Sequence, residues 1–268
     1  MPASTHPFGT FTTGVVAAAA LCLSTSAFAG LDYPAFLMTW DVSNDGANPL
    51  TYDPAAFGSV NDNNDGTWTF LGSNSSARWS IDWDVLVDPN WPDSGGPGPD
   101  SAQVNANIQV TNNSDQFETF SLLMVLPINA IGPSTDMNGS AGLGVSNNQI
   151  DGDAIMRPVA GESIYEAYID VVDVNTDTPA RTLFGGAYQL SAGPFFGQNT
   201  DNADFGNPTP EPGPGANDNI AILLEFELSA GDSASITSQF QIVATPAPGA
   251  LSLMALCGIM IGGRRRRK

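Results

Sequence analysis

The sequence predicts an all-β protein, an antiparallel β-sandwich of immunoglobulin-like or jelly-roll type. Three observations predict it. Apolar and polar residues alternate with a period of two over several segments. Clusters of Gly, Asn and Asp, which favour turns, separate these segments. No stretch of the central region has the apolar spacing of a helix. We expect about nine to twelve strands between residues 30 and 244.

Residues 1–29 have the pattern of a secretory signal peptide. An apolar core at 15–23 is followed by small residues that end in Ala27-Phe28-Ala29, which fits an A-x-A cleavage site. We therefore expect export of the chain and a mature domain of residues 30–244. Both cysteines, Cys22 and Cys257, lie outside that domain, so we expect it to fold without disulfides.

The strand pattern is clearest at residues 79–87, where apolar side chains occupy alternate positions that begin with Trp79 and include Trp83. This spacing predicts that both tryptophans face the core. Residues 103–111 and 234–242 alternate in the same way. Three further segments are more continuously apolar, which favours strands covered on both faces: 117–126, 164–172 and 220–228.

One turn has the beginning of a calcium-binding loop. Oxygen-bearing side chains stand at loop positions 1, 3 and 5, namely Asn61, Asn63 and Asp65, and Gly66 stands at position 6. Position 12, where such loops carry a bidentate Glu, is Gly72. Two interpretations remain open, an ordinary β-turn and a weak calcium site. Calcium is the only cofactor that the sequence suggests.

Two segments rich in Pro and Gly, 88–100 and 207–217, predict loops without regular structure. Trp91 lies in the first of them, outside any alternating segment. An exposed tryptophan there could stack on a sugar ring, so Trp91 is the candidate residue for carbohydrate contact.

Composition limits what the central domain can bind or catalyse. The chain has 28 acidic and 8 basic residues, and its formal net charge is −20 at pH 7. Such a negative field repels nucleic acid, so we expect no nucleic-acid partner. Residues 30–244 contain no Lys, His or Cys, which removes most nucleophile and base pairs and the His/Cys zinc sites.

Carboxylates remain as catalytic groups. A glycosidase needs two of them about 5 to 9.5 Å apart. Glu225 and Glu227 would share one strand face, and Glu162 and Glu166 are close in sequence. Because so acidic a chain forms such pairs by chance, we expect no enzymatic activity, with a carboxylate glycosidase as the remaining alternative.

Residues 245–268 end the chain with an apolar segment and a basic cluster. Residues 250–263 are uncharged over 14 positions, and a helix of that length measures about 21 Å. The basic side chains at 264–268 can extend the span to the interface and hold it on the cytoplasmic side. We therefore expect a single transmembrane helix at 250–263.

These residues resemble the PEP-CTERM sorting signals of bacterial exported proteins. Pro246 and Pro248 match the two prolines of the Pro-Glu-Pro motif, with Ala247 in place of the Glu and Gly249 after it. Residues 250–263 match the apolar helix, and the basic end is Arg264, Arg265, Arg266, Arg267 and Lys268. The resemblance implies processing by an exosortase, a membrane cysteine protease and transpeptidase, and a place at the cell surface or in the extracellular matrix, often beside exopolysaccharide.

Together these observations predict an exported cell-surface or extracellular-matrix protein with a structural or interaction role. The alternative is an adhesin module that binds carbohydrate or calcium. The partners we expect are an exosortase-type enzyme, the membrane and extracellular polysaccharide.

Overall fold

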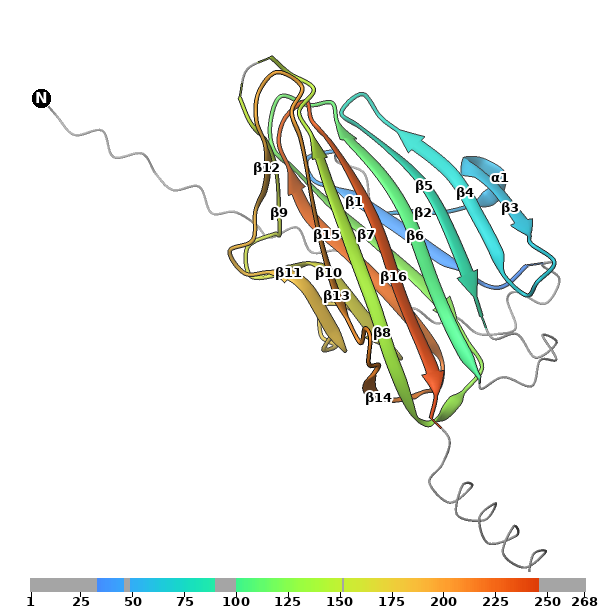
Figure 1. Cartoon of the computed structure of the whole chain (residues 1–268). Coiled ribbons are helices and arrows are strands. Elements are labelled where there is room, and N and C mark those ends of the chain that lie inside the picture. The colour runs from blue at the N-terminus through green and yellow to red at the C-terminus, as the bar shows by residue number, and fades with distance from the viewer. Residues whose placement is uncertain (1–32, 46–48, 90–99, 151, 246–268) are drawn as a thin grey trace, which may run out of the picture.

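The computed structural model describes residues 33–45, 49–89, 100–150 and 152–245 (Figure 1). The predicted signal peptide, Trp91 and residues 246–268 of the predicted sorting segment lie outside these residues. Within the described part of the chain, no helix is both long and apolar enough to cross a membrane.

In the described residues, sixteen strands form two antiparallel sheets that pack face to face, as Figure 1 shows. Sheet A has the order β11-β10-β15-β7-β1-β2, and β9 joins β12 to β15. Its strands are β1 (Leu37–Val42), β2 (Leu50–Thr51), β7 (Glu118–Pro127), β9 (Ala154–Arg157), β10 (Ser163–Ile169), β11 (Arg181–Gly185), β12 (Leu190–Ala192) and β15 (Asn219–Leu228).

Sheet B has the order β13-β8-β16-β6-β5-β4-β3, with β14 also paired to β8. Its strands are β3 (Gly58–Asp62), β4 (Trp68–Ser75), β5 (Trp79–Asp88), β6 (Ser101–Asn112), β8 (Ile131–Ser146), β13 (Gln198–Phe205), β14 (Glu211–Ala216) and β16 (Ser233–Ala244). One helical turn, α1 (Pro54–Phe57), precedes β3. The predicted all-β antiparallel sandwich is confirmed; its assignment to an immunoglobulin-like or jelly-roll type stays a prediction.

The core lies between the sheets and follows the period-two pattern. In β5 the alternate residues that begin with Trp79 are buried, and Trp83 packs on Trp40 of sheet A with ring centroids 5.1 Å apart. Strands β6 and β16 bury one row of side chains each in the same way. The prediction that Trp79 and Trp83 face the core is therefore confirmed.

The continuously apolar strands β7, β10 and β15 all belong to sheet A. Their inner faces contribute to the main core, whereas a second apolar cluster lies on the outer face. That cluster contains Val125, Tyr168, Val171, Ala221 and Leu223. Burial on both faces explains why these segments do not alternate.

The structure corrects two sequence expectations. There are more strands than expected, because short edge strands such as β2 and β12 are too brief to show a period. In addition, β14 forms at Glu211–Ala216, inside the segment predicted to be irregular. Proline is tolerated there because β14 lies beside β8 at the sheet edge and has a register irregularity between Pro214 and Ala216.

Candidate functional site

The solvent face of sheet B carries three aligned rows of mainly polar side chains, which we call the polar face. Each row runs across β5, β6, β16 and β8, as the pairing of these strands dictates. The first row is Leu86, Asn105, Gln239 and Ser140; the second is Asp84, Asn107, Thr237 and Gly142; the third is Asp82, Gln109, Ser235 and Gly144.

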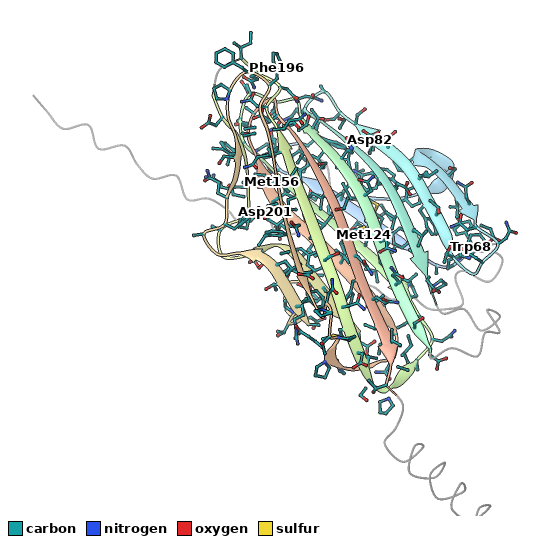
Figure 2. All side chains as sticks on the ribbon, viewed as in Figure 1. Trp68, Asp82, Met124, Met156, Phe196 and Asp201 are labelled. Atoms are coloured by element: carbon teal, nitrogen blue, oxygen red, sulfur yellow. The ribbon has the colours of Figure 1, made fainter. Side chains whose placement is uncertain are left out.

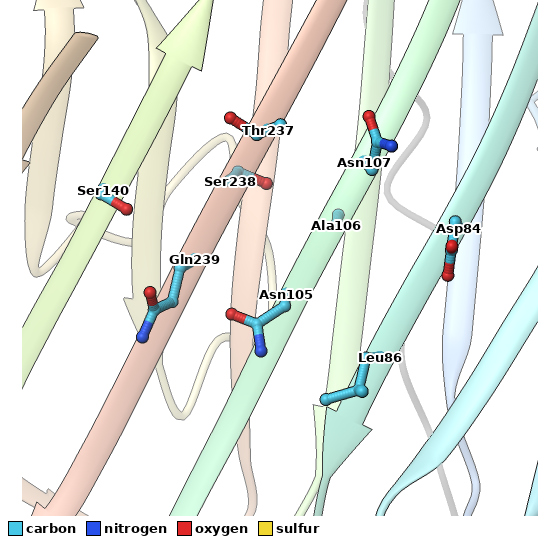
Figure 3. Close-up of a pocket in the computed structure, with 9 residues that line it drawn as sticks. All are labelled: Asp84, Leu86, Asn105, Ala106, Asn107, Ser140, Thr237, Ser238 and Gln239. Atoms are coloured by element: carbon cyan, nitrogen blue, oxygen red, sulfur yellow. The ribbon is translucent and has the colours of Figure 1, made fainter. Parts of the chain in front are cut away.

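Because successive side chains of a strand point to opposite faces of the sheet, the residues of these rows lie on the face away from the core. Because Ile108 and Phe240 are fully buried between the sheets, their neighbours Asn107 and Gln239 must point to solvent. Figure 3 shows these two amides, with Asn105 and Thr237, on adjacent strands of one surface. The alternating sequence pattern indicates that the polar positions of these strands face solvent, but it does not show that they form one continuous surface.

The polar side chains on this face of sheet B differ in how many hydrogen-bonding partners they have within the protein. Gln103 donates to Asn105 at 3.0 Å, and Asn138 donates to Gln241 at 3.2 Å, at one end of the face. In contrast, the side chains of Asn107, Gln239 and Asp84 make no hydrogen bond within the described part of the chain. Each free amide offers two donors and one acceptor to a ligand.

A shallow hollow of about 400 Å³ lies on this face. The side chains of Thr237 and Ser235 lie directly over two glycines of β8, because a Cβ at Gly142 would be 2.7 Å from Thr237 Oγ1 and one at Gly144 would be 2.5 Å from Ser235 Oγ. The residues that line it are drawn in Figure 3: Asp84, Leu86, Asn105, Ala106, Asn107, Ser140, Thr237, Ser238 and Gln239.

The three rows contain two carboxylates and neither a basic residue nor an aromatic ring. The three arginines of the described residues lie elsewhere, each paired with a glutamate: Arg78 with Glu118, Arg157 with Glu227 at 2.6 Å, and Arg181 with Glu211 at 2.5 Å. The polar face therefore disfavours an anionic ligand and suits a neutral one that is rich in hydroxyl groups.

The predicted calcium residues lie in and after β3, in the turn to β4, where local partners occupy them. Asn63 donates to Thr67 Oγ1 and Thr69 Oγ1, each at 3.0 Å. Asp65 accepts from the Thr67 hydroxyl at 2.6 Å and from its backbone N–H at 3.0 Å, and these bonds lower the pKa of Asp65.

The structure thus shows a hydrogen-bonded hairpin turn that begins after Asp62, with Asn61 inside β3. Among the residues that the structure describes, no group of three or more His, Cys, Asp or Glu side chains could hold a metal ion. Calcium binding stays a prediction.

Of the carboxylates considered for glycosidase chemistry, Glu166, Glu225 and Glu227 lie on sheet A, and Glu162 directly precedes β10. Glu227 is paired with Arg157. Burial, followed by repulsion from Glu162 and Glu166, raises the pKa of Glu225 to about 7. Asp41 of β1 adds to this repulsion and was not singled out from the sequence, since only the pairing of β1 and β15 with β7 brings it near.

Comparison with known proteins adds little. No protein-family model and no curated protein matches the chain. Among solved structures, the chain is similar to TmCBM61, determined in complex with β-1,4-galactotriose, at 17% identity and a TM-score of 0.25. The match covers 61% of this chain and 86% of that one. Strand pairing alone therefore defines the class of this protein: an antiparallel β-sandwich in which the three rows on the solvent face of one sheet are mainly polar and carry no basic side chain.

Proposed function

We propose that this protein is a non-enzymatic, exported protein of the cell surface or extracellular matrix that binds a neutral polysaccharide through the polar face. The observation that carries the proposal is the set of aligned amide and hydroxyl side chains around the hollow, including the free Asn107 and Gln239. Sugar hydroxyls both donate and accept, as these side chains do.

The geometry of a sheet suits a long and regular ligand. Neighbouring strands are about 4.8 Å apart, so each row presents hydrogen-bonding groups at a regular spacing. A polysaccharide also repeats its hydroxyl groups along its length. Binding through several weak, repeated contacts fits a face that is shallow rather than a deep pocket.

Export and sorting are the second part of the proposal. The sequence pattern of residues 1–29 supports export, and the resemblance of residues 245–268 to PEP-CTERM signals supports membrane anchoring at 250–263 and processing by an exosortase-type enzyme. An extracellular location would bring the polar face into contact with exopolysaccharide.

The binding proposal is tested by affinity electrophoresis of the full chain in gels that contain dextran, β-1,4-galactan or β-1,4-glucan. The chain should be retarded by at least one of these neutral polymers and not by anionic alginate. The double variant Asn107→Ala/Gln239→Ala should bind about ten-fold more weakly, because two hydrogen-bonding side chains are lost.

Thr182→Ala, an exposed change on edge strand β11 of sheet A, is the matched control and should bind as the wild type does. The proposal fails if no neutral polymer retards the wild type, or if the double variant is retarded equally. Release of reducing sugar from a bound polymer would contradict the non-enzymatic part.

A further inference from the structure

The loop between β12 and β13 exposes two neighbouring aromatic residues. Phe195 is 73% exposed and Phe196 is 65% exposed, unlike the buried phenylalanines of the core. Figure 2 places Phe196 at one extreme end of the sandwich. We call these two residues the aromatic tip. Exposed rings of this size are disfavoured in water, so their position calls for a ligand or partner.

The backbone of the aromatic tip is strained as well as exposed. Phe195 has φ of 63° and Phe196 has φ of 61°, in the left-handed region that bulky side chains rarely adopt. Two features hold this conformation. Gly197 packs so closely that a Cβ there would lie 2.4 Å from the Gly193 carbonyl oxygen, and the Phe196 N–H donates to the Gln149 carbonyl at 3.4 Å. Strain of this kind concentrates at ligand-binding positions.

The aromatic tip is continuous with the polar face. Gln198, two residues after Phe196, pairs with Ser146 of β8, which pairs with Ser233 of β16. Ser233 in turn pairs with Thr111 of β6, so these side chains form a further polar row at the tip end of sheet B. Phe195 and Phe196 therefore precede the first residue of β13 at the same end of sheet B as this polar row.

We propose that Phe195 and Phe196 form a stacking subsite for sugar rings, at the end of the polar face, for the same neutral polysaccharide. This inference rests on the proposed function and adds to it the contact that the polar rows lack. A pyranose ring has C–H faces that pack on an aromatic ring and hydroxyl edges that bond to amides. The aromatic tip and the adjoining Gln198 provide both kinds of group.

Charge argues against a membrane as the occupant. The chain has a formal net charge of −20, and the residues next to the tip in sequence, Pro194, Gly197, Gln198 and Asn199, carry no charge. Loops and helices that insert into anionic bilayers combine their apolar side chains with Lys or Arg. A neutral ligand with apolar ring faces fits these surroundings better.

The test compares variants of the full chain, kept in a detergent without a sugar headgroup, for binding to dextran, β-1,4-galactan and β-1,4-glucan. Phe195→Ala/Phe196→Ala should bind the retained polymer at least about ten-fold more weakly. Phe195→Leu/Phe196→Leu should lose binding too, because it keeps apolar area but not the flat rings. Val172→Ala, at a residue 68% exposed in another loop, is the matched control and should bind normally.

A further variant separates binding from folding. Phe195→Gly/Phe196→Gly relieves the positive φ angles, so its melting temperature should be no lower than that of the wild type while its polysaccharide binding is lost. This result excludes misfolding as the cause of weak binding.

The outcomes distinguish this inference from the proposed function. If the alanine tip variant binds as the wild type does while Asn107→Ala/Gln239→Ala does not, the aromatic tip is not a subsite and the proposed function stands. If no neutral polymer binds the wild type, both fail. Tip-dependent flotation with phosphatidylcholine vesicles, or a tip-dependent dimer in light scattering, without loss of glycan binding in the variants, would also overturn the inference.

Discussion

Glu225 lies on the outer face of sheet A, where strand pairing places Ser121 between it and Asp41. Burial and the nearby carboxylates raise the pKa of Glu225 to about 7. Glu118 has the opposite environment. Its burial alone would raise the pKa, but donation from Arg78, Asn44 and Ser43 outweighs this effect and lowers it. One glutamate therefore opposes folding when ionised, and the other stabilises the fold.

We predict a stability loss with rising pH that depends on Glu225. Below pH 4.5, its ordinary pKa, the group is protonated in both folded and unfolded chains. Between 4.5 and about 7 the folded chain keeps the proton while the unfolded chain loses it, so the free energy of unfolding falls by about 3 kcal/mol. Denaturant unfolding at pH 5 and pH 8 measures the difference.

Glu225→Gln carries no titrating carboxyl and should reduce this pH dependence. Glu211→Gln is the control, because its ion pair with Arg181 is well exposed and contributes little. If Glu225→Gln loses as much stability between the two pH values as the wild type, the carboxyl group is not responsible.

At the scale of the element, β16 shows how one strand serves both the core and the candidate site. It pairs with β6 on one side and β8 on the other, so it lies in the middle of sheet B. Phe240 is fully buried and lies 6.2 Å from Phe205, measured between ring centroids. Gln239, its neighbour, points to the polar face and bonds to no described residue through its side chain.

The two faces of β16 should respond differently to truncation. Phe240→Ala removes a buried ring and should lower the free energy of unfolding by about 3 to 4 kcal/mol. Gln239→Ala removes a solvent-facing amide and should change it by less than about 0.5 kcal/mol. Urea unfolding of each variant measures both. Comparable losses would show that Gln239 is structural and would make it unsuitable as a binding variant.

On the scale of the whole molecule, the aromatic tip and the exit of the chain lie at opposite ends. β16 begins at Ser233, level with Gln198 near the tip, and ends at Ala244, paired with Thr135. Twelve residues of strand separate these ends, which corresponds to about 40 Å. A membrane anchor after residue 245 would therefore hold the aromatic tip away from the membrane.

The predicted sorting segment can be tested apart from the sandwich. Deletion of residues 246–268 keeps Thr245, which donates to the Ser134 carbonyl, and should release a folded domain into the medium. Pro246→Ala/Pro248→Ala should leave an uncut protein in the membrane, because the apolar segment persists while the recognition motif is lost. Fractionation and mass spectrometry measure both.

In a host with an exosortase, the wild type should yield a surface form lighter by about two dozen residues than the form in a host without it. An intact C-terminus in the mature native protein would contradict sorting and leave only the membrane anchor.

By itself, the sequence determined the all-β fold class and which side chains of the alternating strands face the core. Successive side chains of a strand point to opposite faces of the sheet, so the period of two in the sequence matches the period of burial. This period alone predicts that Trp79 and Trp83 lie in the core, where both are buried. Pairing between distant strands was decided only by the tertiary structure. Asn107 and Gln239 are neighbours because β6 pairs with β16, and Asp41 adds to the repulsion on Glu225 because β1 and β15 both pair with β7. The register of such pairs depends on packing over the whole sandwich, which no local pattern of residues records.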